Sequence, residues 1–269
     1  MNTSKKIKNL SLINTRDLTG IKTQDNLLIK EKRLIRSGKL SNASLKDLDI
    51  LKNEYNLNLV IDLRNEVEKK QTPDLLPSGV NLIEKPILVS SHMGMTHEEK
   101  MSDKEALIDF VNRVLSQGDG ISYMKNLYSY FVLDKHCLKM YSEFLQIVKD
   151  HQEGSLLFHC SVGKDRAGIA AAFILKLLNV SNSDIIEDYL LTNKYVLEDV
   201  NKKVGFLKTK INNPLLETCY FNLYLAKEEY ITYLFDLIDK NYGSFNNFRK
   251  EALKFNDEDM EKLKANYLA

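Results

Sequence analysis

A ten-residue loop between two apolar runs constrains this chain more than any other feature of the sequence. Residues 159–168 read His-Cys-Ser-Val-Gly-Lys-Asp-Arg-Ala-Gly. The run before the loop, Ser155–Phe158, is short enough for a buried strand, and the alanine-rich run after it, Ile169–Leu175, is typical of a buried helix. The pattern therefore predicts a strand, a loop and a helix whose first backbone N–H groups can bind an anion.

Two side chains in this loop carry the predicted chemistry. Cys160 precedes Arg166 by five intervening residues. A thiol beside a helix N-terminus and cations has its pKa lowered from ~8.5 to roughly 3.5–7.5, so we expect Cys160 to be a thiolate. The guanidinium of Arg166 can hold two phosphate oxygens at once, and Gly163 and Gly168 allow close approach of the backbone to a ligand. A structural core cysteine is the alternative, but three consecutive charged residues, 164–166, argue against it.

The Cys-x5-Arg loop resembles the signature of the cysteine-dependent protein tyrosine phosphatases. The string Gly-Lys-Asp-Arg-Ala-Gly resembles the bacterial atypical branch, which acts on phosphotyrosine and often on phosphoinositides. Further segments that fit this branch are Asn14–Gly20, Arg36–Gly38, Val60–Arg64 with Glu66, Ile186–Asn193 and Tyr242–Ser244. The resemblance runs from about residue 14 to the carboxyl end and is weaker between about 91 and 135. Thr19 stands where a glycine is expected, and Ala167 replaces the more usual threonine.

The resemblance implies an in-line attack of the Cys160 thiolate on phosphorus, which gives a cysteinyl-phosphate that water hydrolyses. The loop backbone and Arg166 would bind the phosphate oxygens, and neither a metal nor another cofactor is needed. The predicted substrate-binding residues are Ser161, Val162, Gly163, Lys164, Ala167 and Gly168. The expected partners are phosphotyrosine proteins, phosphoinositide headgroups or both.

A general acid must protonate the leaving oxygen. The chain contains no tryptophan, so the separate tryptophan-marked acid loop of many tyrosine phosphatases is absent. The resemblance implies that Asp165 is the acid, and Asp134 is a weaker candidate. Alternatively, Asp165 pairs with a cation such as Arg16 or Arg64 and braces the loop.

Other charged residues are expected to support the loop. Lys164 would bind a second phosphate of an inositol headgroup, or it would offset Asp165. The ring of His159 is expected to bond to the loop backbone. Four residues are assigned to an ion-pair network around the loop, with Arg36 added more cautiously: Arg16, Asp17, Asp62 and Arg64.

The order of the elements predicts an α/β fold, with a central sheet flanked by helices and a helical second half, as in cysteine phosphatases. Expected strands are 27–36, 57–63, 80–87 and 155–160, and expected helices are 44–54, 137–149, 166–178, 183–199, 224–240 and 257–267. Ser183 and Asn256 are expected to start helices. Residues 1–13 are expected to be a flexible N-terminus and 14–269 a single phosphatase domain. Residues 91–135 would form either a lid or an ordinary helical part of the fold.

Composition limits the kinds of partner and the cellular location that we expect for this protein. The chain is 43% apolar and 28% charged with a net charge of +1, so nothing predicts nucleic-acid binding. It has no apolar run of 18 residues, and hence no predicted transmembrane helix. Three cysteines cannot all pair, which favours a reducing compartment. A cytoplasmic location is the default expectation, and export by a signal outside this sequence is the alternative. The sequence does not indicate an oligomeric state.

Two other functions compete with a phosphatase. An arsenate reductase-like thiol enzyme would need Cys137 or Cys219 as a partner for Cys160. A non-catalytic phosphate-binding module would not need the intact cysteine and arginine. A zinc site at His92 and His97 is not expected, because no carboxylate cluster accompanies them.

Overall fold

The computed structural model describes residues 2–89 and 104–269. Within these ranges the strands are β1 (Lys5–Lys6), β2 (Arg16–Asp17), β3 (Leu34–Ser37), β4 (Leu57–Asp62), β5 (Asn81–Glu84) and β6 (Ser155–His159). They form one mixed sheet in the order β1-β2-β3-β6-β4-β5. Strands β3, β6, β4 and β5 are parallel, whereas β1 and β2 add an antiparallel edge. A mixed central sheet of this kind, covered by helices, confirms the predicted fold class.

Side-chain alternation explains why the central strands are buried on both faces. In β6, Leu156 and Phe158 belong to the main hydrophobic core, while Leu157 between them belongs to a second core on the opposite face. Strand β4 alternates in the same way, since Ile61 joins the main core and Val60 the second one. A strand with two apolar faces reads as a continuous apolar run, which is the pattern from which β6 was predicted.

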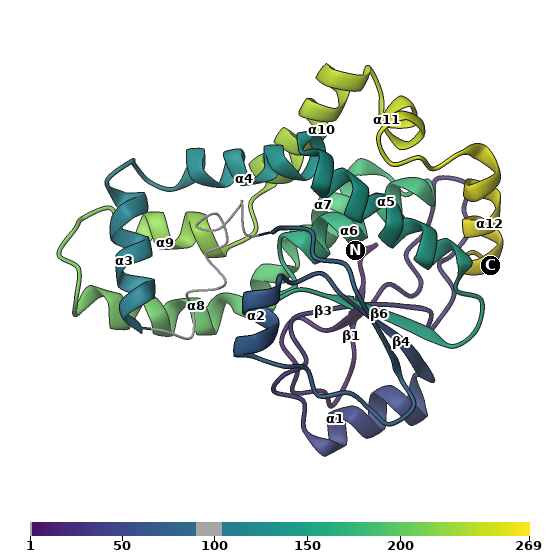
Figure 1. Ribbon diagram of the computed structural model, residues 1–269, viewed down its shortest axis with the longest axis horizontal. Coiled ribbons are helices and arrows are strands. Elements are labelled where there is room, and N and C mark those ends of the chain that lie inside the picture. The colour runs from purple at the N-terminus through teal and green to yellow at the C-terminus, as the bar shows by residue number, and fades with distance from the viewer. Residues whose placement is uncertain (1, 90–103) are drawn as a thin grey trace.

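The helices occupy most of the rest of the described chain. They are α1 (Leu45–Asp49) with its π-helical continuation η1 (Ile50–Glu54), α2 (Glu66–Gln71), α3 (Lys104–Leu115), α4 (Ile121–Leu133), α5 (Lys135–Asp150), α6 (Arg166–Leu177), α7 (Asn182–Leu190), α8 (Thr192–Lys208), α9 (Leu216–Tyr224), α10 (Glu228–Tyr242), α11 (Phe245–Glu251) and α12 (Asp257–Tyr267). Helices α5, α6 and α7 lie on one side of the sheet and α1 on the other (Figure 1). None of these helices is long and apolar enough to cross a bilayer.

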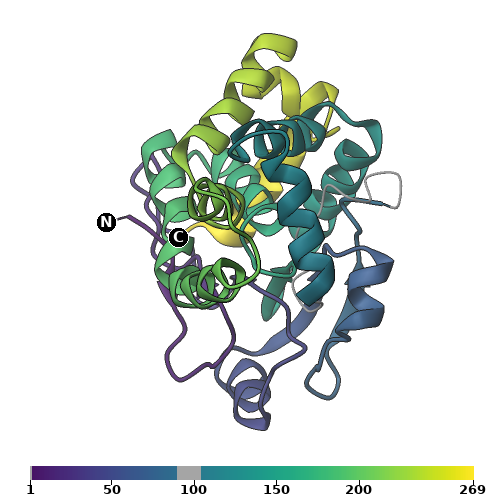
Figure 2. The ribbon, with the colours of Figure 1, turned by 90° about the vertical axis from the view of Figure 1, so that its left-hand side faces the viewer.

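A helical arm extends away from the sheet. Helix α9 packs against α3, α4 and α8, and the four helices project together to the left of Figure 1. Figure 2 shows the same group from its outer end. The proposed lid region, 91–135, contributes α3 and α4 to this arm. Residues 91–103, which include His92 and His97, lie outside the described residues.

Several predicted boundaries were wrong. The predicted strand 27–36 is reduced to β3, because residues 28 and 29 form isolated bridges with Lys22 and Leu268 instead of a sheet strand. The predicted helix 183–199 is divided between α7 and α8 at Leu191, and α7 is capped by Ser181, two residues before the predicted start. Asn256 caps α12 as predicted. In the segment 2–13, expected to be a flexible N-terminus, Ile7, Leu10 and Leu12 are buried in the second core.

Candidate active site

The Cys-x5-Arg loop lies at the carboxyl edge of the sheet, where three parallel strands end together. His159 of β6 is in register with Ser37 at the end of β3 and with Asp62 at the end of β4. The chain then passes through residues 160–165 and enters α6 at Arg166. The carboxyl ends of parallel strands and the N-terminus of the following helix therefore meet at Cys160, as the sequence predicted.

The backbone carbonyls of residues 161–163 all bond away from the loop. Their donors are the backbone N–H of Lys39 (3.2 Å), Nδ2 of Asn14 (3.1 Å) and Nη2 of Arg36 (2.8 Å), in chain order. In a trans peptide the next N–H points opposite to the carbonyl, so the N–H groups of residues 162–164 face the inside of the loop. One of these is seen bonded to the nucleophile, since the N–H of Gly163 donates to Cys160 Sγ at 3.3 Å.

Gly163 occupies a position that only glycine fits. Its φ is +76°, and a Cβ there would lie 2.7 Å from the carbonyl oxygen of Ser37 and 2.9 Å from Nδ2 of Asn14. The Asn14 amide is one of the contacts that hold the loop, and Ser37 ends the neighbouring strand β3, so a larger residue would displace the loop itself.

Arg166 is held by Glu68 of α2. Its Nη1 and Nη2 donate to Glu68 Oε2 and Oε1 at 2.6 and 2.7 Å, and both side chains are almost fully buried. Ser161 Oγ donates to the same Oε1 at 2.5 Å. Burial works to raise the pKa of Glu68, but Arg166 and the hydrogen bonds from Ser161 and Asn65 outweigh it and leave the pKa lowered. An ionised Glu68 thus fixes the plane of the arginine and one side of the loop.

Asp165 faces tyrosines rather than arginines. Tyr128 donates its hydroxyl to Asp165 Oδ1 at 2.7 Å, and the Tyr189 hydroxyl lies 2.6 Å from that of Tyr128. Lys164 Nζ lies 3.4 Å from the same Oδ1 and donates to the carbonyl of Leu223 at 2.6 Å. Asp165 thus contacts Tyr128 and Lys164, whereas Arg16 pairs with Asp188 and Arg64 pairs with Asp62 and Asp74. The buried Lys164 offsets Asp165, as one of its two sequence interpretations predicted.

A buried ion-pair cluster supports the loop from behind. Arg36 Nη1 donates to Asp188 at 2.7 Å while its Nη2 holds the carbonyl of Gly163. Arg16 Nη2 lies 3.7 Å from Asp188, and Ser4 donates its backbone N–H and its hydroxyl to the same carboxylate. Burial, followed by the charge of Arg36, lowers the pKa of Arg16 to about 9. Arg16 and Arg36 thus lie in the predicted network, with Asp188 as the shared anion.

A second charged cluster surrounds His159. Its Nε2 lies 3.0 Å from Asp74 and its Nδ1 3.2 Å from the carbonyl oxygen of Cys160. Arg64 Nη2 contacts both Asp62 at 2.8 Å and Asp74 at 2.7 Å. Burial opposes protonation of His159, but Asp62 and Asp74 outweigh it and raise its pKa. Asp62, Asp74 and His159 also have ligand-type atoms within 4.8 Å of one another, and the Arg64 guanidinium pairs with both of these carboxylates.

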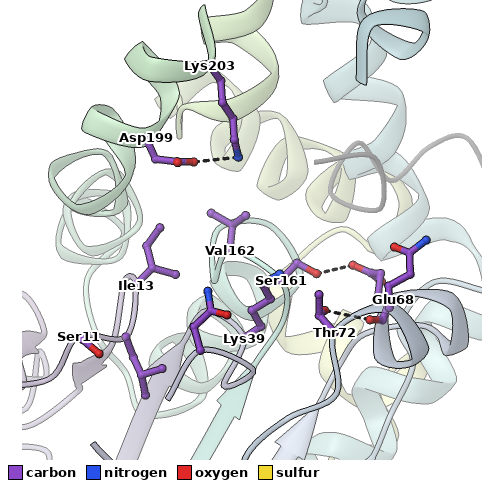
Figure 3. A pocket seen from close by; sticks show the side chains of 12 residues that line it. Ser11, Ile13, Lys39, Glu68, Thr72, Ser161, Val162, Asp199 and Lys203 are labelled. Atoms are coloured by element: carbon purple, nitrogen blue, oxygen red, sulfur yellow. Dashed lines mark hydrogen bonds and ion pairs between the residues drawn. The ribbon is translucent and has the colours of Figure 1, made fainter. Parts of the chain in front are cut away.

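A cavity of about 280 Å³ opens beside the loop. Ser161 and Val162 line it together with Glu68, and Figure 3 shows Lys203 and Asp199 across the cavity from Ser161. Cys160 is 0% and Arg166 1% exposed, and neither side chain lines this cavity.

Some predicted site residues lie elsewhere. Asp17 accepts the backbone N–H groups of Thr19 and Lys32, away from the loop. Ala167 and Gly168 are buried within α6, and a Cβ on Gly168 would meet Arg36 at 3.2 Å rather than the cavity. Asp134 caps α5, which gives it a structural role.

The sequence interpretation missed Glu68, Tyr128, Asp74 and Lys39. A signal existed for Glu68, because Asn65 and Glu68 have the spacing of a capping box, which the structure contains. The other three lie far from the loop in sequence, and no local pattern marks them.

Two further cysteines bear on the thiol-enzyme alternative. Cys137 and Cys219 are both buried and free. Burial raises the pKa of Cys137 well above its usual value and that of Cys219 to about 12. At neutral pH neither thiol is ionised, which disfavours a relay through a second cysteine.

Comparisons with known proteins agree with the geometry. A model of a family described as the tyrosine phosphatase family matches residues 7–269. A Cupriavidus necator protein provisionally named a tyrosine-protein phosphatase is 27% identical over 266 residues, which is 96% of this chain and 87% of that protein. A Nostoc commune protein named a tyrosine-protein phosphatase is 30% identical over 162 residues, 60% of this chain and 49% of that protein.

Proposed function

The chain belongs to the tyrosine phosphatase family, and from that premise we propose that it hydrolyses phosphotyrosine in proteins through a cysteinyl-phosphate on Cys160. Phosphoinositides are the second substrate class that the loop sequence favours. The observation that carries the proposal is that the Cys160 sulfur and the Arg166 guanidinium are both fixed by hydrogen bonds at the same loop. The N–H of Gly163 donates to the Cys160 sulfur, and the fork of Arg166 is fixed beside the same loop by Glu68.

The proposed reaction has two displacements at phosphorus. In the first, the Cys160 thiolate forms the S–P bond while the bond to the leaving oxygen breaks. In the second, water attacks phosphorus, the S–P bond breaks, and inorganic phosphate leaves with the thiolate restored. The inward N–H groups of residues 162–164 and the Arg166 N–H groups that do not bond Glu68 would bind the three equatorial oxygens, where charge is spread in the transition state.

Asp165 is the proposed proton donor. Protonated Asp165 would give its proton to the leaving phenolate oxygen, and the resulting carboxylate would accept a proton from the attacking water. The hydrogen bond from Tyr128 fixes the orientation of this carboxyl group. The alternative is that Asp165 only braces Lys164 and Tyr128.

Phosphate release from a phosphotyrosine peptide and from a soluble phosphoinositide tests the proposal. We expect release by the wild type and none by Cys160→Ser, while Cys137→Ser, which alters another buried cysteine, keeps the activity. Retained turnover in Cys160→Ser would refute the covalent mechanism. Absence of release from the folded, reduced wild type would favour the phosphate-binding module.

A further inference from the structure

We propose that Lys39 and Lys203 form an accessory anion site that selects phosphotyrosine peptides with an acidic residue next to the phosphotyrosine. The inference rests on the proposed function and adds a specificity to it. Both lysines line the cavity beside the nucleophile loop. They come from distant parts of the chain, Lys39 from the turn after β3 and Lys203 from α8.

Lys39 is fixed to the loop that carries the nucleophile. Its backbone N–H donates to the carbonyl of Ser161, the residue after Cys160, at 3.2 Å. Within residues 2–89 and 104–269, its ammonium group has no hydrogen-bond or ion-pair partner, although the side chain is partly buried. Burial lowers the pKa of Lys39, and Arg64 and Lys203 lower it further by repulsion. An anion in the cavity would relieve that repulsion.

The carboxylates near this site already have partners. Glu68 is neutralised by Arg166, and Asp199 pairs with Lys203 at 2.9 Å. Among the described residues that line the cavity, the charge of Lys39 thus stays unbalanced by a carboxylate, and it lies close to the loop. Lys164, the cation that the sequence favoured for a second anion, is buried against Leu223 and Asp165 and does not line the cavity.

The other wall of the cavity favours a peptide over an inositol headgroup. Leu12, Ile13 and Val162 give it an apolar side. An inositol bisphosphate has hydroxyl or phosphate groups around its whole ring and offers less apolar surface to that side than an aromatic ring does. A phosphotyrosine peptide brings an aromatic ring for the apolar wall and, with an adjacent glutamate or aspartate, a carboxylate for the lysines.

The test compares phosphotyrosine peptides of one sequence that carry glutamate or glutamine immediately before or after the phosphotyrosine. For the wild type we expect kcat/KM to be about two- to fivefold higher with glutamate on one side, the upper part of the range for a partly exposed ion pair. Lys39→Gln should bring this ratio close to one. Lys203→Gln should do the same or invert the ratio, because Asp199 would then repel the peptide.

Lys202→Gln is a matched control. Lys202 is the neighbouring residue on α8 and pairs with Glu198 as Lys203 pairs with Asp199, but it does not line the cavity. We expect this variant to keep the wild-type ratio. The preference should also shrink between 0.05 and 0.5 M salt, roughly the range over which screening of exposed charges becomes strong.

Equilibrium binding of the same peptides to Cys160→Ser separates this inference from the proposed function. A glutamate preference in binding that Lys39→Gln removes supports the site even if the wild type shows no turnover. No preference, or an equal preference in Lys39→Gln, overturns it while hydrolysis still stands. If Lys39→Gln weakens binding of a soluble inositol bisphosphate but not of the acidic peptide, the assignment to peptides is wrong.

Discussion

Replacing Glu68 with glutamine tests whether one buried carboxylate positions the phosphate-binding arginine. Glutamine keeps the shape of the side chain but has one acceptor oxygen and an NH2 group in place of a carboxylate. Both partners are almost fully buried, and Glu68 accepts hydrogen bonds from Arg166, Ser161 and the backbone of Asn65. The new NH2 group would therefore face donors, and the arginine would lose its counter-charge.

The burial of the Glu68–Arg166 ion pair determines how much stability and activity we expect Glu68→Gln to lose. Breaking a buried ion pair costs about 3–5 kcal/mol, and the retained oxygen should reduce this to about 2–3 kcal/mol in the free energy of unfolding. At about 2–4 °C per kcal/mol, Tm should fall by roughly 4–12 °C. A misplaced Arg166 should lower kcat/KM about 100-fold, the order seen for displacements near 1 Å.

Urea denaturation and hydrolysis of an aryl phosphate, measured on the folded protein, are the assays. Glu66→Gln is the control, because Glu66 lies on the same helix with its side chain 68% exposed and paired with Lys69. Its urea midpoint should stay close to that of the wild type, because surface substitutions of this kind change stability little. The reasoning is refuted if Glu68→Gln matches Glu66→Gln in both assays. A loss of stability with unchanged kcat/KM would refute the positioning role alone.

Two other predictions concern the loop. Asp165→Asn should slow substrates with poor leaving groups by at least about tenfold more than those with good ones, because only poor leaving groups need the proton; an equal loss on both would make Asp165 a brace beside Tyr128. The pKa of His159 is raised in the folded protein, so the protonated ring that pairs with Asp74 stabilises the fold. This stabilisation is fully present below the pKa of an unfolded histidine, ~6.5. This stabilisation is lost as the pH rises through the folded pKa, so urea midpoints should fall over that window in the wild type and less so in His159→Gln; parallel profiles would contradict the assignment.

The sequence predicted correctly those elements of the fold that a local pattern of apolar residues defines. The run 155–158 and the alanine-rich run from Ile169 each carry enough apolar residues to define one buried element, and the loop between them needs no distant information. The predicted strand 27–36 was too long, because four charged residues, 30–33, separate two short apolar segments and only the second of these pairs with neighbouring strands of the sheet. The boundary at Leu191 failed because α7 and α8 join without a glycine or proline to mark the break.

The site residues also fall into those that a local sequence pattern predicts and those that it does not. Cys160 and Arg166 were readable because their spacing within one loop carries the chemistry. Glu68 and Tyr128 approach the loop from elements 98 and 37 residues away from their partners, and pairing over such separations leaves no periodic signal in one sequence. Capping-box spacing could have placed Glu68 on a helix start, but not against the arginine.

The buried charges around the loop are better explained by geometry than by stability. Buried ion pairs contribute little net stability compared with apolar packing, so Arg36 and Asp188 are not needed to fill space. What Arg36 does is bind the carbonyl of Gly163 while Asp188 fixes its other nitrogen. Turning that carbonyl outward turns the next N–H inward, and Asn14 and the backbone of Lys39 act in the same way on the two preceding carbonyls. Three donors outside the loop thus set the direction of three donors inside it. A loop whose N–H groups already point inward needs little rearrangement of its own backbone when phosphate binds, which is a physical reason for placing Arg36 behind it.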